Sequence, residues 1–374
     1  MKVLHTESSV NWGGQEYRIL DQMNWLTANG HQCGLAARPG SDIAKRAAAT
    51  GLSVHPVAYQ GHYNPAAILK IRAIVKRHGY QIADCHGSRD VITQAFARDL
   101  APVIRTRHLS QPLKNKLHRR LQWRHGSDAV IATAQCIKDE ILNKGLAATE
   151  RIHVIGEWAG ETFFDNFRRV QHRNDVRAEF QVPTGDALVA VVGMLRGDKA
   201  QEHLIHSAAE MKRRGRPITA LIVGSVTNTQ DTYEAELRAL ASRLGVTGAV
   251  RFAGYRDDVA RLTQGADILA ITSTAVEAQS RTAPQGFASL TPVVASNMGG
   301  VAELVRPGET GWLVPPGDAG AYADAFIAIL DAPDKAAEVT NRARDFAETS
   351  LRIAAKMAET LAVYEKFIGK GTAS

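Results

Sequence analysis

Residues 268–296 read ILAITSTAVEAQSRTAPQGFASLTPVVAS, and this stretch contains the pattern that decides the fold. It begins with a short apolar run, Ile268–Ile271, passes through a polar loop into a helix-length segment, and returns to a second apolar run at Pro292–Ala295. Short apolar runs joined by a helix are typical of neighbouring parallel strands, because parallel strands need a crossover connection. The stretch therefore predicts one unit of a parallel α/β sheet.

The same alternation of strand and helix extends in both directions. Further strand-like runs occur at Lys2–His5, Gln32–Ala37, Ile82–Cys85, Val103–Arg105, Ala129–Ala132, Leu188–Gly193, Thr219–Val223 and Val250–Phe252. Helix-length segments between them include Tyr17–Asn29, Pro65–His78, Gln135–Asn143, Glu202–Arg213, Thr232–Leu244 and Asp257–Gln264. The pattern occurs twice, before and after a polar join at 161–184. We therefore predict two doubly wound α/β domains that face each other across a cleft, with sites in the loops after the strands.

The composition excludes several broad classes of protein. Of the 374 residues, 45% are hydrophobic and 22% are charged, which is typical of a globular chain and not of a disordered chain, a collagen or a coiled coil. The three cysteines have no metal-type spacing, which favours free thiols in a reducing compartment. The first residues, MKVLHTESS, lack the apolar core of a signal peptide, and no apolar run has the roughly 20 residues of a membrane span. We expect a cytoplasmic protein.

Two loops that follow predicted strands contain residues suited to phosphate groups. In the first loop, NWGGQE, the small residues Gly13 and Gly14 let the backbone approach a ligand at the start of a helix. In the loop GMLRGDK of the second half, Arg196 and Lys199 offer two cations to a diphosphate. The alternative for the first loop is an ordinary tight turn between strand and helix. The alternative for the second loop is a solvated pair of cations on a surface turn. Neither loop has the pattern G-x-G-x-x-G, which disfavours a dinucleotide-dependent dehydrogenase.

The loop and helix of the opening stretch contain a third group of candidates. Glu277 lies in the loop after a predicted buried strand, and Gln285 lies in the helix that follows. A carboxylate in front of a helix can bind sugar hydroxyls, and the backbone around Ser280, Arg281 and Thr282 can face phosphate. Gln285 could bind a ribose hydroxyl. For each residue taken alone, an ordinary strand–loop–helix connection is the alternative.

Residues 277–303 and 307–318 resemble the C-terminal signature of the family-four retaining glycosyltransferases. The family pattern is E-x7-E, a helix of small residues, G-x-P-V-V-A-S, a Gly-Gly pair, a Glu and finally T-G-x-L-V-P-P-G-D. The resemblance includes the WGGQE loop and covers most of the chain. Three positions depart from the pattern. Gln285 stands where the family has the second Glu, and Met194 stands where the family has the Arg of G-R-L-x-x-x-K. Leu290 replaces the glycine of G-x-P-V-V.

The resemblance implies the GT-B fold, with two facing Rossmann-like domains, and retaining transfer of a sugar from a UDP- or GDP-type nucleotide sugar. It implies catalytic roles for Glu277, His86 and Lys199, and donor binding by Gly13, Gly14, Arg196, Lys199, Ser280, Arg281, Thr282 and Gln285. The expected domains are an acceptor-side domain at 1–163, a nucleotide-sugar domain at 164–350, and a C-terminal helix at 351–374 that could cross back to the first domain. The implied process is assembly of bacterial lipopolysaccharide or surface polysaccharide.

The chain contains no Asp-x-Asp, the motif that bridges a metal ion and the diphosphate in the other large glycosyltransferase fold. In the GT-B resemblance, cationic side chains and a helix end take the place of the metal. In retaining transfer of this kind the leaving phosphate takes the proton of the acceptor, so the protein mainly positions the substrates. We therefore predict a metal-independent enzyme that needs no cofactor besides its nucleotide-sugar donor.

A basic stretch in the first half suggests the nature of the acceptor. Seven cations lie between residues 105 and 124, and no acidic residue follows until Asp128. The predicted surface for an anionic acceptor consists of Arg105, Arg107, His108, Lys116, Arg119 and Arg120. Such charge favours a glycan or lipid-linked anionic acceptor and peripheral contact with the cytoplasmic face of the inner membrane, whereas a solvated basic helix is the alternative. Nucleic acid is disfavoured, because no binding module accompanies the charge.

Two other functions compete with sugar transfer. Gln285 and Met194 make a non-catalytic or weakly active nucleotide-sugar-binding protein conceivable. A sugar-nucleotide epimerase or a phosphorylase of the same fold is disfavoured, because epimerases have a different signature and phosphorylases a pyridoxal site on a longer chain. The sequence does not specify the base, the sugar or the acceptor.

Overall fold

The computed structural model describes residues 1–59, 61, 63–108, 112–113, 117–226, 232–275 and 277–368. The chain forms two compact units. The first unit contains Met1–Gly156 together with the segment that begins at Ile353, and the second contains Glu157–Arg352. The expected boundary was at residue 163, but Phe163 and Phe164 pack in the core of the second unit.

The first unit is built on a seven-stranded parallel sheet with the order β3-β2-β1-β4-β5-β6-β7. The strands are β1 (Lys2–Glu7), β2 (Gln32–Ala37), β3 (Ser53–Pro56), β4 (Ile82–Cys85), β5 (Val103–Arg107), β6 (Ala129–Ala132) and β7 (Ile152–Val154). The central strands are buried along almost their whole length, as expected for a parallel sheet that is covered on both faces. The sequence prediction missed the edge strands β3 and β7, which are short and partly exposed.

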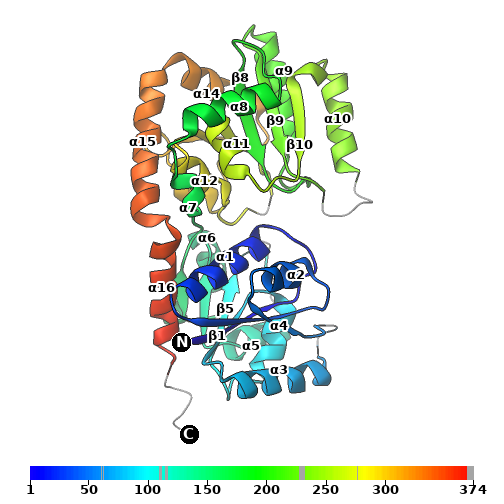
Figure 1. Cartoon of the computed structure of the whole chain (residues 1–374), viewed down its shortest axis with the longest axis vertical. Helices are drawn as coiled ribbons and strands as arrows, with labels where there is room; N and C mark the ends of the chain where they lie inside the picture. The colour runs from blue at the N-terminus through cyan, green and yellow to red at the C-terminus, as the bar shows by residue number, and fades with distance from the viewer. Residues whose placement is uncertain are drawn as a thin grey trace. The chain divides into compact units, whose positions relative to one another are not determined.

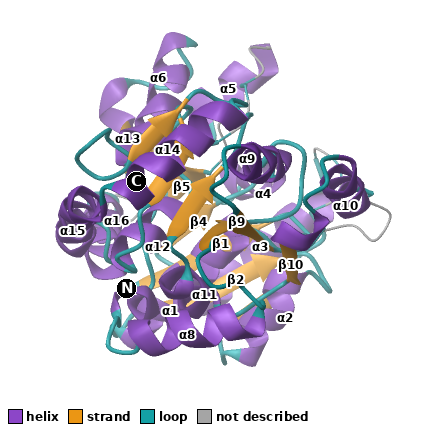
Figure 2. Cartoon of the chain, turned by 90° about the horizontal axis from the view of Figure 1, so that it is seen from above, coloured by secondary structure: helices purple, strands orange, loops and turns teal. Residues whose placement is uncertain are grey.

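The described residues of the first unit also form seven α-helices (Figures 1 and 2). They are α1 (Gly14–Ala28), α2 (Asp42–Ala49), α3 (Pro65–His78), α4 (Ser88–Ala95), α5 (Leu117–His125), α6 (Gln135–Asn143) and α16 (Ile353–Glu365). The last of these, α16, comes from the C-terminal end of the chain and packs against α1. Its Tyr364 is fully buried in the first unit.

The second unit contains a six-stranded parallel sheet with the order β10-β9-β8-β11-β12-β13. The strands are β8 (Ala187–Val192), β9 (Ile218–Val223), β10 (Val250–Gly254), β11 (Ile268–Ile271), β12 (Val293–Ser296) and β13 (Trp312–Val314). Alternate residues of each strand enter different cores, because successive side chains of a strand point to opposite faces. Val189 and Val191 belong to one core and Leu188 and Ala190 to the other.

Helices supply the second layer of both cores. The helices of the second unit are α7 (Glu161–Phe164), α8 (Arg169–Glu179), α9 (Glu202–Arg213), α10 (Tyr233–Arg243), α11 (Val259–Gly265), α12 (Thr282–Ala288), α13 (Val301–Leu304), α14 (Ala319–Asp331) and α15 (Pro333–Ser350). Residues of α9, α10 and α14 pack in one core, and residues of α7, α11, α12 and α15 pack in the other.

Each sheet has a point at which the strand order reverses. In the first unit β1 lies between β2 and β4, and in the second β8 lies between β9 and β11. Ligands of open α/β sheets bind beyond the carboxyl ends of the strands at such a point. The prediction of two Rossmann-like parallel sheets is confirmed. Within the described ranges, no helix combines the length and apolar character that a membrane span requires.

Candidate functional site

In the second unit, Lys199 and Glu277 meet beyond the switch point of the sheet. Lys199 lies in the loop after β8 and Glu277 in the loop after β11. The ammonium nitrogen of Lys199 lies 2.6 Å from Oε2 of Glu277, and the hydroxyl of Ser273 donates to the same oxygen at 2.6 Å. The side chain of Glu277 is nearly buried, whereas that of Lys199 is about one-quarter exposed. The structure thus places a cation and a carboxylate together where a ligand of this sheet would bind.

Backbone contacts hold these two loops against each other. The hydroxyl of Thr272 donates to the carbonyl of Lys199 at 2.8 Å, and the amide of Thr274 donates to the carbonyl of Asp198 at 3.1 Å. Gly299 packs directly against the backbone of the loop that contains Glu277. Its φ is +52°, and a Cβ at this position would lie 1.9 Å from the carbonyl oxygen of Glu277. Only glycine fits this position without moving the backbone of Glu277.

Arg196 lies in the same loop as Lys199 but has a carboxylate of its own. Its guanidinium donates to Asp198, with one bond of 2.6 Å. This hydrogen bond raises the pKa of Arg196 and keeps it charged. Asp198 nevertheless offsets much of the charge that Arg196 would offer to a diphosphate.

The other predicted donor-binding residues lie at and within α12. Ser280 and Thr282 are buried, and the amide of Thr282 donates weakly to the hydroxyl of Ser280 at 3.4 Å. The guanidinium of Arg281 lies 5.8 Å from the ring centre of Trp158. Gln285 is half-buried on the same helix, in the position that the sequence predicted.

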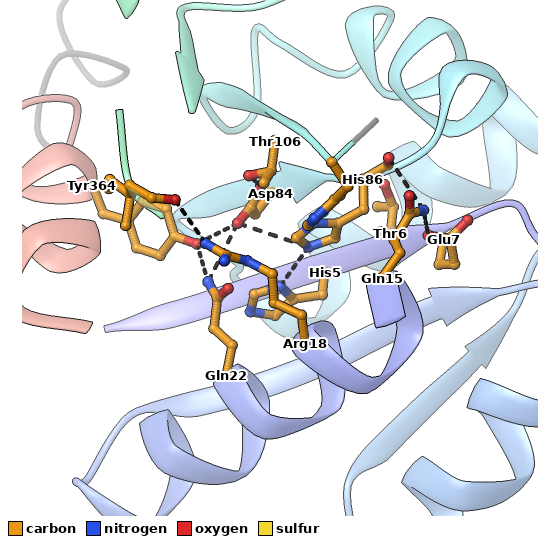
Figure 3. Close-up of polar contacts among 12 residues, drawn as sticks. His5, Thr6, Glu7, Gln15, Arg18, Gln22, Asp84, His86, Thr106 and Tyr364 are labelled. Atoms are coloured by element: carbon orange, nitrogen blue, oxygen red, sulfur yellow. Dashed lines mark hydrogen bonds and ion pairs between the residues drawn. The ribbon is translucent and has the colours of Figure 1, made fainter. Parts of the chain in front are cut away.

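In the first unit, Gly13 and Gly14 form the N-terminus of α1. Gly13 precedes the helix with an extended backbone, at a φ of −159°. This conformation is open to any residue, so a left-handed turn does not explain the glycine pair. The buried carboxylate of Glu7 ends the preceding strand, and it accepts hydrogen bonds from the amide of Ser9 and the side chain of Gln15 (Figure 3).

Three histidines form a hydrogen-bonded chain at the carboxyl ends of β1, β4 and β5. Nε2 of His86 lies 3.1 Å from Nδ1 of His5, and Nδ1 of His86 lies 2.9 Å from Nε2 of His108. The side chain of His86 is fully buried. The resemblance implied a catalytic role for His86, but in this structure both of its ring nitrogens face other histidines. His86 therefore offers no exposed nitrogen to a substrate.

Asp84, near the end of β4, lies beside this chain, with its Oδ2 3.7 Å from Nε2 of His86 (Figure 3). Its Oδ1 accepts a hydrogen bond from Thr106 at 2.6 Å, and its Oδ2 accepts one from Tyr364 of α16 at 2.6 Å. Gln22 of α1 donates to the hydroxyl of Tyr364 at 2.8 Å and to Oδ2 of Asp84 at 3.4 Å. Sequence reasoning missed Asp84, Tyr364, Gln22 and His5. The available signal was a run of polar residues inside otherwise apolar strands.

Burial determines the charge state of the histidines. It lowers the pKa of His5 to about 3 and that of His86 to about 3, so both rings are neutral at pH 7. His5, Asp84 and His86 each place one nitrogen or oxygen within 4.8 Å of the others, a set that could hold a metal ion.

A second group of buried carboxylates lies beside the glycine loop. Asp90 of α4 accepts hydrogen bonds from Thr6 at 2.7 Å and from Ser8 at 3.0 Å. Burial raises the pKa of Glu7 to about 8, and the nearby carboxylates of Asp90 and Glu16 contribute. Burial also raises the pKa of Asp90.

The predicted basic surface is wrong for two of its members. Arg105 and His108 are buried, because β5 is a central strand whose side chains are covered by helices. The guanidinium of Arg105 lies 4.1 Å from the ring centre of Trp123, and burial lowers the pKa of Arg105 to about 10. Arg107, Arg119 and Arg120 are partly exposed, and Lys116 lies outside the described residues.

A groove of about 380 Å³ lies beside β7, apart from the residues discussed so far. It is lined by Lys138, Ile152, His153, Val154, Ile155, Glu359, Ala362, Val363 and Lys366. None of the predicted site residues lines it.

Two protein-family models match the chain. Residues 12–157 match the model described as Glycosyltransferase Family 4, and residues 172–346 match the model described as Glycosyl transferases group 1. Both models describe glycosyltransferases, and together they cover most of the chain. The first match includes His86 and His108 of the histidine chain, and the second includes Lys199 and Glu277.

Known proteins resemble this chain in sequence or in fold. The D-inositol 3-phosphate glycosyltransferase of Nocardia farcinica is 33% identical over 193 residues, which are 50% of this chain and 42% of that protein. The chain spans about half the length of the curated relatives it matches. A glycosyltransferase of Rickettsia africae has a similar structure, with a TM-score of 0.87, 20% identity and 98% of both chains covered. Anabaena HepE in complex with UDP has a TM-score of 0.82 and 21% identity, with 98% of this chain and 100% of HepE covered.

Proposed function

We propose that this protein is a retaining glycosyltransferase that transfers a sugar from a nucleotide sugar to a glycan or lipid-linked acceptor. The observation that carries the proposal is the Lys199–Glu277 pair beyond the switch point of the second sheet. A diphosphate needs a cation, and sugar hydroxyls need a carboxylate. This pair offers both groups within one hydrogen bond of each other.

Lys199 binds the diphosphate of the donor in this proposal, and Glu277 binds hydroxyls of the sugar. The two side chains neutralise each other in the unliganded protein, so the donor has to replace the ion pair. Ser273 continues to hold Oε2 of Glu277 when Lys199 turns to the phosphates. Lys199 then stabilises the negative charge that develops on the departing diphosphate, and no metal ion is needed there.

The remaining donor contacts come from the neighbouring loops. Gln285 binds a ribose hydroxyl, and Ser280, Arg281 and Thr282 lie near the phosphates. Arg196 adds a weaker contact, because Asp198 already accepts hydrogen bonds from its guanidinium. The UDP complex of HepE supports a uridine nucleotide as the first donor to test.

The first unit receives the acceptor in this proposal. Arg107, Arg119 and Arg120 remain partly exposed and supply positive charge for an anionic acceptor. The Nocardia relative is named a D-inositol 3-phosphate glycosyltransferase, and a phosphate-bearing acceptor supports the same chemistry. Leu117 and Leu121 of α5 are exposed beside these arginines, as expected of a helix that contacts an anionic membrane surface. Assembly of lipopolysaccharide or surface polysaccharide is the process that we infer.

A non-catalytic nucleotide-sugar-binding protein is the second candidate. Gln285 offers an amide where the family has a carboxylate, and Asp198 offsets the charge of Arg196. Both features weaken the donor site without removing Lys199 or Glu277.

One experiment separates the two candidates. UDP-, GDP- and ADP-sugars are first screened by thermal shift, because a ligand that binds the folded state stabilises it. Hydrolysis of the best donor is then measured for the native protein and for Glu277→Ala, with Glu234→Ala, at a partly exposed glutamate of α10, as matched control. A rate that falls only in Glu277→Ala supports catalysis. A thermal shift without hydrolysis or transfer supports the binding protein.

A further inference from the structure

The loop between β11 and α12, residues 272–281, contains Glu277 and is the donor loop of the proposed function. Its Gln279 makes two hydrogen bonds that connect the loop to two other parts of the chain. The side-chain oxygen of Gln279 accepts a hydrogen bond from the backbone N–H of Glu157 at 2.9 Å. The side-chain nitrogen donates to Oε2 of Glu303 in α13 at 3.1 Å. Since an amide has one accepting and one donating end, one side chain serves both partners.

The hydrogen bond to Glu303 fastens the donor loop to the segment around α13. That segment contacts the loop at a second point, because Gly299 packs against the carbonyl of Glu277. Gly299 and Glu303 lie on either side of Val301, the first residue of α13. The loop is thus held at Glu277 and again at Gln279, which restricts rotation of the backbone between these two residues.

The hydrogen bond to Glu157 fastens the same loop to the place where the chain passes from one unit to the other. The first segment of the first unit ends at Gly156, and the second unit begins at Glu157. On the side of the first unit, the guanidinium of Arg18 donates to the carbonyl of Ile155 at 3.0 Å and to that of Gly156 at 2.9 Å. Side chains therefore hold the backbone of three consecutive residues at this crossing: Arg18 holds two of them and Gln279 holds the third.

Burial makes these bonds difficult to exchange for bonds to water. Arg18 and Glu157 are buried, and Gln279 is half-buried. A buried backbone N–H that loses its acceptor costs more free energy than an exposed one, because water does not replace the lost bond. The N–H of Glu157 therefore favours the placement of the donor loop in which Gln279 reaches it.

We propose that Gln279 is a positioning residue of the donor site: by bridging Glu157 and Glu303, it fixes the loop from which a carboxylate reaches the sugar. The inference rests on the proposed function, in which Glu277 is that carboxylate. The cation proposed for the diphosphate, Lys199, lies in a different loop, after β8. Gln279 therefore governs binding of the sugar more than binding of the nucleotide.

The test compares the binding of UDP-glucose with that of UDP, because only UDP-glucose offers sugar hydroxyls to Glu277. Isothermal titration calorimetry measures both affinities for the native full-length protein, for Gln279→Leu and for Gln171→Leu. We expect Gln279→Leu to weaken binding of UDP-glucose about five-fold or more and to leave binding of UDP within about two-fold of native. Gln171→Leu is the matched control, because Gln171 also donates to a carboxylate, that of Asp175 on α8, at 2.7 Å. It should bind both compounds like the native protein.

An exchange of groups covers the case in which Gln279→Leu does not fold. Gln279→Glu keeps an acceptor for the N–H of Glu157 but places a second carboxylate against Glu303, so it should weaken binding of UDP-glucose. Gln279→Glu/Glu303→Gln again pairs an amide with a carboxylate, in reversed order. Its binding of UDP-glucose should return to within about two-fold of native. Absence of this recovery in a folded double variant overturns the proposal.

Amide hydrogen exchange examines the bond without a ligand. The N–H of Glu157 should exchange faster in folded Gln279→Leu and at the native rate in Gln171→Leu. A native rate in Gln279→Leu overturns the proposal, as does unchanged binding of UDP-glucose or equal weakening of UDP-glucose and UDP. Failure of the native protein to bind either compound contradicts the proposed uridine donor, whereas the exchange rate still decides whether Gln279 holds the crossing.

Discussion

The ammonium nitrogen of Lys199 lies 2.6 Å from a carboxylate oxygen of Glu277, although 78 positions separate the two residues. The switch point of the second sheet brings them together, because β8 and β11 are neighbours there. In the proposed donor site, the phosphates bind Lys199 and the sugar hydroxyls bind Glu277, so donor binding exchanges this ion pair for two new contacts.

Lys199→Ala should weaken both donor binding and transfer. Without the ammonium, the departing diphosphate loses its main cation, and we expect transfer to fall about 100-fold or more. The measurement is the rate with saturating donor, together with the thermal shift that the donor produces. Lys212→Ala, at an exposed lysine of the same unit, is the control and should behave like the native protein. Equal rates in the two variants would contradict the assignment.

Gly299→Ala should weaken donor binding, beyond the loss of stability that comes from backbone strain alone. A non-glycine residue at positive φ costs about 1–2 kcal/mol. Gly308→Ala incurs this cost alone, because its φ is +72° and no atom lies within 4 Å of the new Cβ. Gly299→Ala also pushes against the carbonyl of Glu277, so it should lose the donor-induced thermal shift while Gly308→Ala retains it. Equal donor binding by both variants would show that Gly299 does not support the site.

Transfer should continue in the presence of a chelator, since Lys199 takes the part of a metal at the diphosphate. The rate is measured after dialysis against EDTA and after addition of Mg²⁺ or Mn²⁺. We expect the rate of transfer to change less than about two-fold. Removing a charge that stabilises the leaving group would have a far larger effect. Loss of transfer in EDTA, with recovery on adding either ion, would contradict metal independence.

The first unit should lose stability as the pH rises from about 5 to 8. The pKa of Glu7 is about 8 in the folded protein and 4.5 ordinarily, so in this window the folded state holds a proton that the unfolded state has released. The histidines act at lower pH: with a pKa of about 3 instead of 6.5, His5 and His86 lower the stability as the pH falls below 6.5. Glu7→Gln should remove most of the loss between pH 6.5 and 8, at most about 1.4 kcal/mol per pH unit.

Amide hydrogen exchange in β1 and β4 is the readout for Glu7, because it reports on the first unit alone. Glu150→Gln, at an exposed glutamate of the same unit, is the control and should keep the native pH dependence. A pH dependence that is the same in Glu7→Gln and in the native protein would assign the loss to other groups.

Replacing Lys116, Arg119 and Arg120 together by Glu should abolish binding to vesicles that contain phosphatidylglycerol. Each cation near an anionic membrane contributes about 1 kcal/mol, and the substitution reverses three charges. Co-sedimentation with the vesicles measures the effect. The control reverses three exposed cations of the second unit, Lys212, Arg213 and Arg243. Unchanged sedimentation of the first variant would contradict membrane contact through α5.

The apolar pattern of the sequence predicted most of the fold, for a physical reason. Central parallel strands are buried on both faces and therefore appear as continuous apolar runs, as in Ile268–Ile271. The missed strands, such as Ser53–Pro56 and Trp312–Val314, lie at sheet edges and are short and partly exposed, so their apolar signal is weak.

The candidate site was predictable only where its residues follow strands in a known order. Glu277 and Lys199 follow adjacent strands, so the topology implies that they are close. Tyr364 lies 280 positions from Asp84, and a tyrosine in an amphipathic helix has the appearance of an ordinary core residue. Arg105 shows a further limit, because a count of cations does not reveal which of them face inward from a central strand.

The return of the chain to the first unit constrains how proteins of this kind can be recombined. The first unit is made from two segments, one before Glu157 and one after Arg352. A hybrid of two relatives that is joined only once, near residue 157, would therefore receive its sheet from one parent and the helix with Tyr364 from the other. Functional hybrids should need two junctions, so that Asp84 and Tyr364 are inherited together.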